Sequence, residues 1–202
     1  NSYSIQKRKT KNFVFLVVAR FSERKGIHDT IVAFSNIAKV KDNVELRIVG
    51  NGEYKSKLVK LVESLKLIEK VVFIDNFLTG NPRETVMQEM ASCDVFLLNS
   101  FTTKAGSKEG TPIVLMEAQA IGRPVIATRH AGISEIVIND VTGITVEERD
   151  VNGIFEAMVK MMDNPELVFK YGFNGKKHIE QEFNNIIQQD RLYHIYKEYI
   201  AE

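Results

Sequence analysis

Two glutamates eight positions apart are the residues of this chain best suited to chemistry. Glu109 lies in a glycine-rich loop, and Glu117 lies inside a helix that we predict over residues 112–121. A helix rises about 1.5 Å per residue, so we expect the two carboxylates to lie well apart. This separation disfavours an acid and a base that act on one glycosidic bond. It favours two separate contacts with hydroxyl groups, because one carboxylate accepts from two neighbouring hydroxyls.

The start of that predicted helix has the features of an anion site. Pro112 suits the first helical turn, where its missing N–H costs nothing, and Thr111 suits the N-cap position before it. The backbone amides from Gly110 to Val114, among them that of Ile113, would then face an anion. Apolar residues flank Glu117 in this helix, so we expect its charge to be partly buried and to have a partner.

A second loop supplies positive charge. Arg20 and Lys25 follow the apolar run 13–19, which predicts a strand buried on both faces. Arginine suits two-pronged contact with phosphate and lysine supplies a compact charge, while the helix that follows adds free N–H groups. Gly26 permits a tight turn in this loop. The alternative is an ordinary solvated loop, and this segment alone does not decide between the two.

Two glycines mark a third loop. Gly50 and Gly52 follow the predicted strand 44–49 and precede a predicted helix. Glycine permits close approach of the backbone to a ligand, but it is also the ordinary residue of turns. This loop therefore indicates a site only in combination with the other two.

Strands and helices alternate along the chain. Besides the two strands above, short apolar runs predict strands at 71–74, 95–98, 124–128 and 143–146, with helices between them. This alternation predicts an α/β fold, a Rossmann-like doubly wound parallel sheet of about six strands with helices on both faces. In such a sheet, ligands bind outside the carboxyl ends of the strands, where all three loops are expected.

The carboxy-terminal part of the chain is predicted to be helical, with breaks near Pro165 and at residues 183–185. The helix after the second break carries a broad apolar stripe. It either packs on this domain's own sheet or reaches toward a partner domain outside the chain, and we adopt the second assignment. The predicted parts are therefore a tail or linker (1–11), a Rossmann-like domain (12–182) and a carboxy-terminal helix (183–202).

Composition disfavours several classes of protein. The chain has 202 residues, 44% of them hydrophobic, and a net charge of +1, so a nucleic-acid partner has little support. Its single cysteine, Cys93, rules out an internal disulfide and suits a reducing compartment. No apolar run approaches the ~20 residues that span a bilayer and no signal peptide is visible, so we expect a cytoplasmic protein. The histidines lack ligand spacing, so we expect no metal, and the role of His130 stays open.

In combination, these motifs resemble those of the family 4 retaining glycosyltransferases, which have two Rossmann-like halves in the GT-B arrangement. Glu109 and Glu117 match the E-x7-E signature of that family. Its cationic loop and its glycine turn are matched by Arg20, Lys25, Gly26, Gly50 and Gly52. The resemblance covers the donor-binding half, from residue 12 to the end. Residues 104–150 are most similar to bacterial exopolysaccharide or colanic-acid-type transferases.

The resemblance implies a role for each residue. Arg20 and Lys25 would hold the diphosphate of the donor and stabilise its charge as it leaves, and with Glu109 they form the implied catalytic set. Glu109 would bind the hydroxyls of the donor sugar, and Glu117 those of the ribose. The implied donor-binding positions are Gly26, Gly50, Gly52, Asn76, Phe77, Gly110, Thr111, Pro112, Ile113 and Glu117, with the base near Asn76 and Phe77.

The implied reaction transfers a hexosyl group from a UDP-sugar or GDP-sugar to a glycan or lipid-linked acceptor in polysaccharide biosynthesis, without a metal or other cofactor. The acceptor site would belong to a missing amino-terminal domain, so this domain alone is expected to be inactive. The full-length protein is expected in the cytoplasm or peripheral at the inner membrane. Two alternatives stay open: a sugar-nucleotide epimerase of similar fold, and a non-catalytic regulatory module that binds a nucleotide-sugar.

Overall fold

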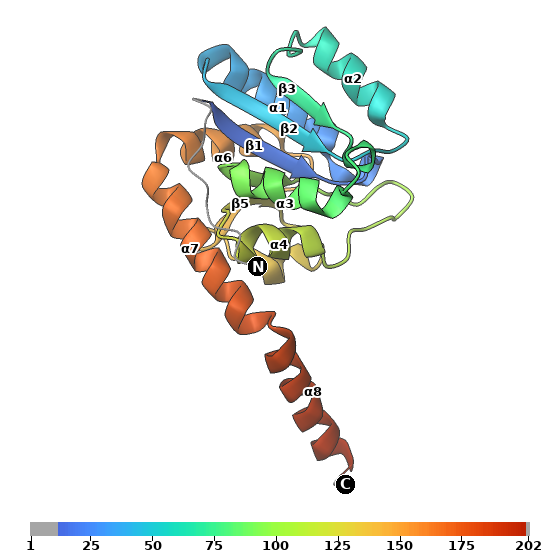
Figure 1. Ribbon diagram of the computed structural model, residues 1–202, viewed down its shortest axis with the longest axis vertical. Coiled ribbons are helices and arrows are strands. Elements are labelled where there is room, and N and C mark those ends of the chain that lie inside the picture. Colours follow the sequence, from blue (N-terminus) through green and yellow to red (C-terminus); the bar gives the residue numbers. More distant parts are fainter. Residues whose placement is uncertain (1–11, 201–202) are drawn as a thin grey trace.

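The chain folds around one parallel sheet. The computed structural model describes residues 12–200, which form a six-stranded sheet covered by helices on both faces (Figure 1). The strands are β1 (Phe13–Val18), β2 (Val44–Val49), β3 (Val71–Ile74), β4 (Val95–Leu98), β5 (Val125–Thr128) and β6 (Gly143–Val146). The α-helices are α1 (Ile27–Val40), α2 (Lys55–Ser64), α3 (Pro82–Ser92), α4 (Ile113–Ala120), α5 (Ile133–Ile136), α6 (Val151–Asp163), α7 (Pro165–Glu182) and α8 (Asn185–Ile200). Short 3-10 helices are η1 (Glu23–Lys25) and η2 (Asn76–Leu78).

The direction of winding changes beside β1. The strand order is β3-β2-β1-β4-β5-β6, and every pairing of neighbours is parallel. The chain therefore winds from β1 to β3 on one side and from β4 to β6 on the other. The loops after β1 and β4 diverge at the carboxyl ends of these strands, which opens a crevice there. The predicted Rossmann-like fold, its parallel sheet and its strand number are confirmed.

Burial on both faces explains the unbroken apolar runs of the central strands. In β1, Phe15 and Val17 face a layer that contains α1, α2 and α6. Val14 and Leu16 face the opposite layer, which contains α3, α4 and α5. All four side chains are at most 1% exposed. Each such buried apolar side chain contributes about 1.5–3 kcal/mol, so the centre of the sheet holds the strand ends in place.

The start of α4 differs from the prediction. The helix begins at Ile113, and Pro112 is its N-cap, with an extended backbone (ψ 104°) and no side-chain cap bond. The predictions of Thr111 as the cap and of Pro112 in the first turn were therefore wrong. A residue that precedes a proline, here Thr111, seldom adopts the helical conformation. Pro112 also keeps an extended ψ, so the helix starts one residue later than predicted. The short helices α5, η1 and η2 were not predicted either.

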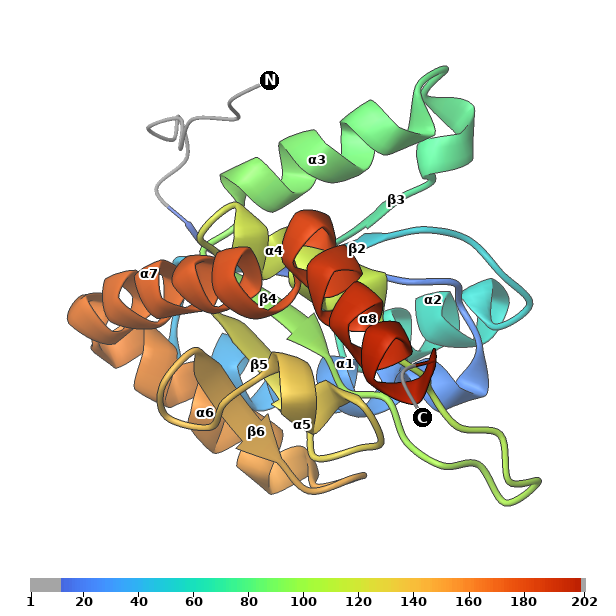
Figure 2. The same cartoon turned by 90° about the horizontal axis from the view of Figure 1, so that it is seen from below.

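Helix α8 projects away from the sheet in Figure 1, and in the view from below it is drawn in front of the other elements (Figure 2). Every one of its residues is exposed, and it follows α7 after a short break. Its apolar side chains include Ile186, Leu192, Ile195, Tyr196 and Tyr199. The alternative that we did not adopt, in which this helix packs on the domain's own sheet, is therefore excluded. Its assignment to a partner domain stays a prediction, as do the boundaries at residues 12, 182 and 183, and the predicted tail 1–11 lies outside the described residues.

The described helices include none that is both long enough and apolar enough to cross a bilayer. Cys93 is fully buried in the layer that contains α3 and α4, as expected for a core residue.

Replacing Gly26 with alanine is expected to destabilise the fold more than the same change at Gly80. Both glycines have a positive φ, +61° and +79°, so alanine costs about 1 kcal/mol of backbone strain at either site. A Cβ at Gly26 would lie 1.8 Å from the carbonyl oxygen of Asn99, whereas nothing lies within 4 Å at Gly80. Urea unfolding measures both variants, and we expect Gly26→Ala to lose about 2 kcal/mol more than Gly80→Ala. Equal losses would contradict the tight contact.

Candidate functional site

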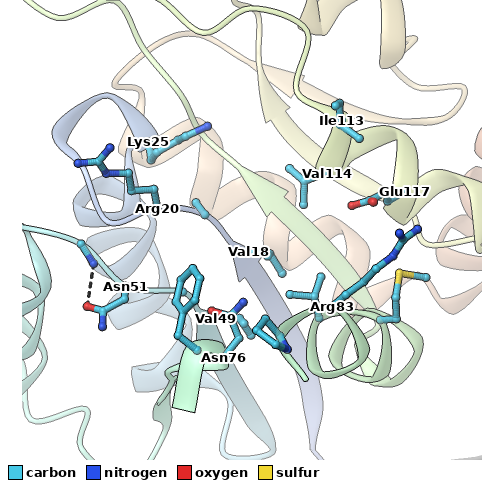
Figure 3. A pocket seen from close by; sticks show the side chains of 17 residues that line it. Val18, Arg20, Lys25, Val49, Asn51, Asn76, Arg83, Ile113, Val114 and Glu117 are labelled. Carbon is cyan, nitrogen blue, oxygen red and sulfur yellow. Dashed lines mark hydrogen bonds between the residues drawn. The ribbon is translucent and has the colours of Figure 1, made fainter. Parts of the chain in front are cut away.

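A cleft of about 950 Å³ opens at the carboxyl ends of the central strands. Figure 3 shows Arg20 and Lys25 on one side of this cleft and Glu117 on the other, with Val18 and Val49 at the strand ends between them. The predicted site residues that line it are Arg20, Lys25, Gly50, Gly52, Asn76, Phe77, Ile113 and Glu117. Those that do not line it are Gly26, Glu109, Gly110, Thr111 and Pro112. The cleft lies at the topological switch point, where the sequence motifs were expected to meet.

Lys25 and Glu109 form an ion pair at the back of the cationic loop. The two side chains are only 12% and 10% exposed, and Ser100 donates a second hydrogen bond to the same carboxylate oxygen at 3.1 Å. Burial raises the pKa of Glu109, but the hydrogen bond and charge of Lys25, with Ser100 and Arg24, outweigh it, so this pKa lies below its usual value. The carboxylate is therefore ionised and held in place at neutral pH.

Glu117 is placed differently from Glu109. It lies on the side of α4 that faces the cleft, next to the buried residues Leu115, Ala118 and Gln119. Within residues 12–200 its carboxylate has no hydrogen-bond or ion-pair partner, so the predicted partner for its charge is absent and that prediction was wrong. The reason is that the cleft keeps this side of α4 open to water. An unpaired carboxylate at this wall is available to a ligand as a hydrogen-bond acceptor.

Arg20 reaches the mouth of the cleft. Its guanidinium contacts Glu53 at 3.3 Å, and its side chain is 76% exposed. An exposed ion pair of this kind contributes little to stability, so Glu53 does not fix the orientation of the Arg20 side chain. The guanidinium can therefore turn to an anionic ligand at small cost.

The glycine turn after β2 serves packing between loops. Gly50 has a φ of +136°, and a Cβ there would lie 2.1 Å from the carbonyl oxygen of Ala19. At Gly52 a Cβ would lie 2.5 Å from the carbonyl oxygen of Phe21. These close approaches bring the turn against the loop after β1 and form one side of the cleft. Gly26 likewise allows a close approach, in this case to the backbone of Asn99, and it does not line the cleft itself.

The loop before α4 lies at the rim. Gly110 and Thr111 are exposed and pack beside Gly132, while Pro112 is buried. Ile113 and Val114 line the cleft, so the first turn of α4 faces it. The first N–H groups of a helix have no acceptor within the helix. The first turn of α4 thus supplies donors, although Gly110, Thr111 and Pro112 lie outside the cleft wall.

The sequence interpretation missed the residues of α3 that line the cleft, and it also missed Glu148. Arg83, Val86 and Met87 of α3 line the cleft, and Figure 3 shows the guanidinium of Arg83 on the same side as Glu117. A helix opened by Pro82 after a strand was the available signal, because its first turn must face the same edge of the sheet. Glu148 contacts His130, whose role the sequence left open, and His130 accepts the backbone N–H of Glu109 at 2.9 Å.

No group of three or more His, Cys, Asp or Glu side chains is arranged to hold a metal ion within the part of the chain that the structure describes. The expectation that no metal is needed stays a prediction.

Comparisons with known proteins identify similar chains. Residues 3–178 match the family described as "Glycosyl transferases group 1". The capsular polysaccharide biosynthesis glycosyltransferase CapM of Staphylococcus aureus is 31% identical over 193 residues, which cover 95% of this chain and 47% of CapM. A GDP-mannose-dependent monoacylated alpha-(1-6)-phosphatidylinositol monomannoside mannosyltransferase of Corynebacterium glutamicum is 32% identical over 178 residues, 88% of this chain and 45% of that protein.

The fold also has solved counterparts. The structure of Anabaena HepE in complex with UDP and glucose matches with a TM-score of 0.78 at 22% sequence identity, over 93% of this chain and 48% of HepE. This chain therefore spans about half the length of the relatives it matches. The similarity to a capsular polysaccharide enzyme agrees with the exopolysaccharide-type resemblance of the sequence motifs.

Acidification is expected to remove the stabilising contribution of Glu109. Because its pKa in the folded chain is lowered, the contribution is present above the usual value of about 4.3 and is lost as the pH falls through the folded pKa. Thermal unfolding of the wild type and of Glu109→Gln between about pH 3 and pH 7 measures this effect. The difference between their melting temperatures is expected to shrink at the acidic end.

Glu63→Gln is a suitable control for this titration, because Glu63 is an exposed residue of α2 with no side-chain partner among the described residues. Its melting curve is expected to follow that of the wild type at every pH. A gap between Glu109→Gln and the wild type that stays constant down to the lowest pH would contradict the assigned ion pair.

Proposed function

The chain belongs to the glycosyl transferases of group 1, and we propose that it binds the nucleotide-sugar donor. Its fold is one half of the GT-B arrangement. The observation that carries the proposal is the cleft with cations on one side and an unpaired carboxylate, Glu117, on the other. A nucleotide-sugar has matching groups, because its diphosphate is anionic and its ribose carries two neighbouring hydroxyls.

The diphosphate is assigned to the cationic side of the cleft. Lys25 and Arg20 both line it, and the first turn of α4 supplies N–H groups from the opposite side. Breaking the bond between sugar and phosphate leaves a nucleoside diphosphate of growing negative charge. Cations and amides already aimed at that charge lower the barrier, since they need no rearrangement during the reaction.

The two carboxylates are assigned to the two sugars of the donor. Glu117 lines the cleft without a partner and accepts from the ribose diol. Glu109 lies behind Lys25 and accepts from the hydroxyls of the transferred hexose. In this arrangement Lys25 lies between Glu109 and the diphosphate, so one cation contacts both the sugar-binding carboxylate and the diphosphate.

The base is assigned to the side formed by η2 and α3. Phe77 is 70% exposed and offers a flat apolar face, while the Oδ1 atom of Asn76 is buried without a hydrogen-bond partner. Such an unsatisfied acceptor is the kind of group that a bound ligand or a water satisfies. The donor is a UDP-sugar or a GDP-sugar. HepE was crystallised with UDP, and the corynebacterial relative is named for GDP-mannose.

The complete reaction needs more than this chain. We assign to the full-length protein the transfer of a hexosyl group to a glycan or lipid-linked acceptor in polysaccharide biosynthesis, in line with the name of CapM. The acceptor site belongs to an amino-terminal domain, toward which α8 reaches, so this domain alone binds donor without transferring it. No metal or other cofactor takes part, and the enzyme works in the cytoplasm or at the inner face of the membrane.

The two earlier alternatives are separated by different means. Membership of the glycosyl transferases of group 1 removes the sugar-nucleotide epimerase. A regulatory module that binds nucleotide-sugar without catalysis would share the same cleft. Transfer assays on the full-length protein distinguish it, because a regulatory module gives no glycosylated product.

Replacing Glu117 with glutamine is expected to weaken nucleotide binding. The change removes the charge that accepts two ribose hydroxyls, and hydrogen bonds to charged groups are worth about 1.5–3 kcal/mol each, so we expect a loss of roughly tenfold or more. Calorimetric titration with UDP, GDP and ADP measures the affinity of the wild type and of Glu117→Gln. The nucleotide that binds most tightly identifies the base.

Glu63→Gln is again the control, because it removes one glutamate charge at a helix surface outside the cleft. Its affinity is expected to equal that of the wild type. If Glu117→Gln binds as tightly as the wild type, the ribose assignment is wrong. If none of the three diphosphates binds the wild type at millimolar concentration, the proposed function itself is wrong.

A further inference from the structure

A closed network of hydrogen bonds holds both ends of the loop between β4 and α4. At the far end of this loop, the backbone N–H of Glu109 donates to Nε2 of His130 at 2.9 Å. Nδ1 of His130 lies 2.5 Å from Oε1 of Glu148. At the near end, the backbone N–H of Thr102 donates to Oε2 of Glu148 at 2.9 Å, and its hydroxyl contacts Oε1 at 3.4 Å. The network thus joins Thr102 to Glu109 through two residues that follow β5 and β6.

The direction of each bond in the network follows from the chemistry of its atoms. A backbone N–H can only donate, so Nε2 of His130 is the acceptor and carries no proton. The proton is then on Nδ1, from which it is donated to Glu148. Burial raises the pKa of Glu148, but the hydrogen bonds from Thr102 and His130 lower it by more than burial raises it. The net pKa is therefore below its usual value, and this carboxylate stays ionised. His130 is 4% exposed and has both ring nitrogens engaged, which fixes the plane of the imidazole.

Each of the two partners, His130 and Glu148, is followed by a residue with an unusual backbone conformation. Ala131, which follows His130, has a φ of +42°, and Arg149, which follows Glu148, has a φ of +64°. A residue with a Cβ in this region costs of order 1 kcal/mol or more, and such strain persists where the surroundings impose it. Arg149 is held there by Asp29 at 2.9 Å and lies over the ring of Phe101. The fold therefore accepts strain at both turns that carry the network.

The middle of the loop contributes little to the position of Glu109. Residues 104–108 are exposed, and the turn closes on itself through Thr103 and Ser107. The remaining restraint on the tip is Arg24, whose contacts with it are long, at 3.3 and 3.4 Å. The position of Glu109 thus depends on two holds: Lys25 and Ser100 on its carboxylate, and His130 on its main chain.

These two holds respond differently to a bound donor. Under the proposed function, on which this inference rests, the diphosphate attracts Lys25 and so weakens the contact of Lys25 with Glu109. The bond to His130 is made by the main-chain N–H of Glu109 and not by its carboxylate, and His130 does not line the cleft. We propose that His130 is a positioning residue, which keeps the main chain of Glu109 in place so that its carboxylate meets the hydroxyls of the donor sugar.

Two amide substitutions separate the contacts of His130. In His130→Gln the side-chain oxygen comes near the place of Nε2, so the acceptor for the Glu109 N–H is kept. In His130→Asn the shorter amide comes near the place of Nδ1, so the contact with Glu148 is kept and the acceptor for Glu109 is lost. A merely structural histidine would be replaced equally well or equally badly by both.

The measurement is the gain in affinity that the sugar adds to the nucleoside diphosphate. Calorimetry gives it as the ratio of Kd values for UDP and UDP-glucose, and for GDP and GDP-mannose. We expect this ratio of Kd values to be roughly tenfold smaller in His130→Asn than in the wild type. The affinity of His130→Asn for the diphosphate alone is expected to stay within about twofold of the wild-type affinity. His130→Gln is expected to keep most of the gain. His194→Asn, at an exposed histidine of α8, is the matched control and is expected to change neither value.

Amide hydrogen exchange adds a readout that needs no ligand. The Glu109 amide is expected to exchange faster in His130→Asn and to stay protected in His130→Gln. If His130→Asn does not fold, Glu148→Ala takes its place, with the same expected loss of sugar-dependent gain. If the Glu109 amide exchanges rapidly in His130→Asn but the gain in affinity from the sugar is retained, the inference is overturned. It is also overturned if the wild type binds a nucleoside diphosphate but gains no affinity from either sugar. A wild type that binds no nucleotide overturns the proposed function instead.

Discussion

The ion pair between Lys25 and Glu109 is the interaction on which the site depends. The two residues are 84 positions apart and meet because β4 returns to the free side of β1 after the chain has completed β2 and β3. A charge with so little exposure is tolerated only with a partner, so each loop requires the other to be in place. The left-handed turn at Gly26 and its close contact with Asn99 serve the same purpose, since they bring the lysine loop against the end of β4.

This interaction also couples the two ends of the proposed donor. A diphosphate that binds Lys25 competes with Glu109 for the same charge. The carboxylate then needs other donors, which the hydroxyls of a sugar supply and a bare diphosphate does not. Under the proposed function, binding energy from the sugar would in this way be directed to the bond that breaks, which is how binding contributes to rate rather than to affinity alone.

The sequence was sufficient where a property is local. Runs such as 13–18 and 44–49 mark strands because both faces of a central parallel strand are buried, and the breaks near 165 and 183 follow from local helix chemistry. Properties set by distant segments were not predictable. His130 and Glu148 follow different strands and meet only in the folded sheet. Glu117 lacks the expected partner because it faces an open cleft and not a neighbouring element. The misplaced cap at Thr111 arose because the conformation of Pro112 depends on the loop that precedes it.

Helix α8 has a mechanical consequence. Its 16 residues form a rod roughly 24 Å long, joined to α7 through a break of two residues. A rod of this length acts as a lever, so a rotation of about 10° at the break moves its far end by about 4 Å. Small changes in backbone angle at residues 183 and 184 therefore become displacements of atomic size at the other end. The position of anything attached to the far end of α8 is therefore sensitive to the backbone of those two residues.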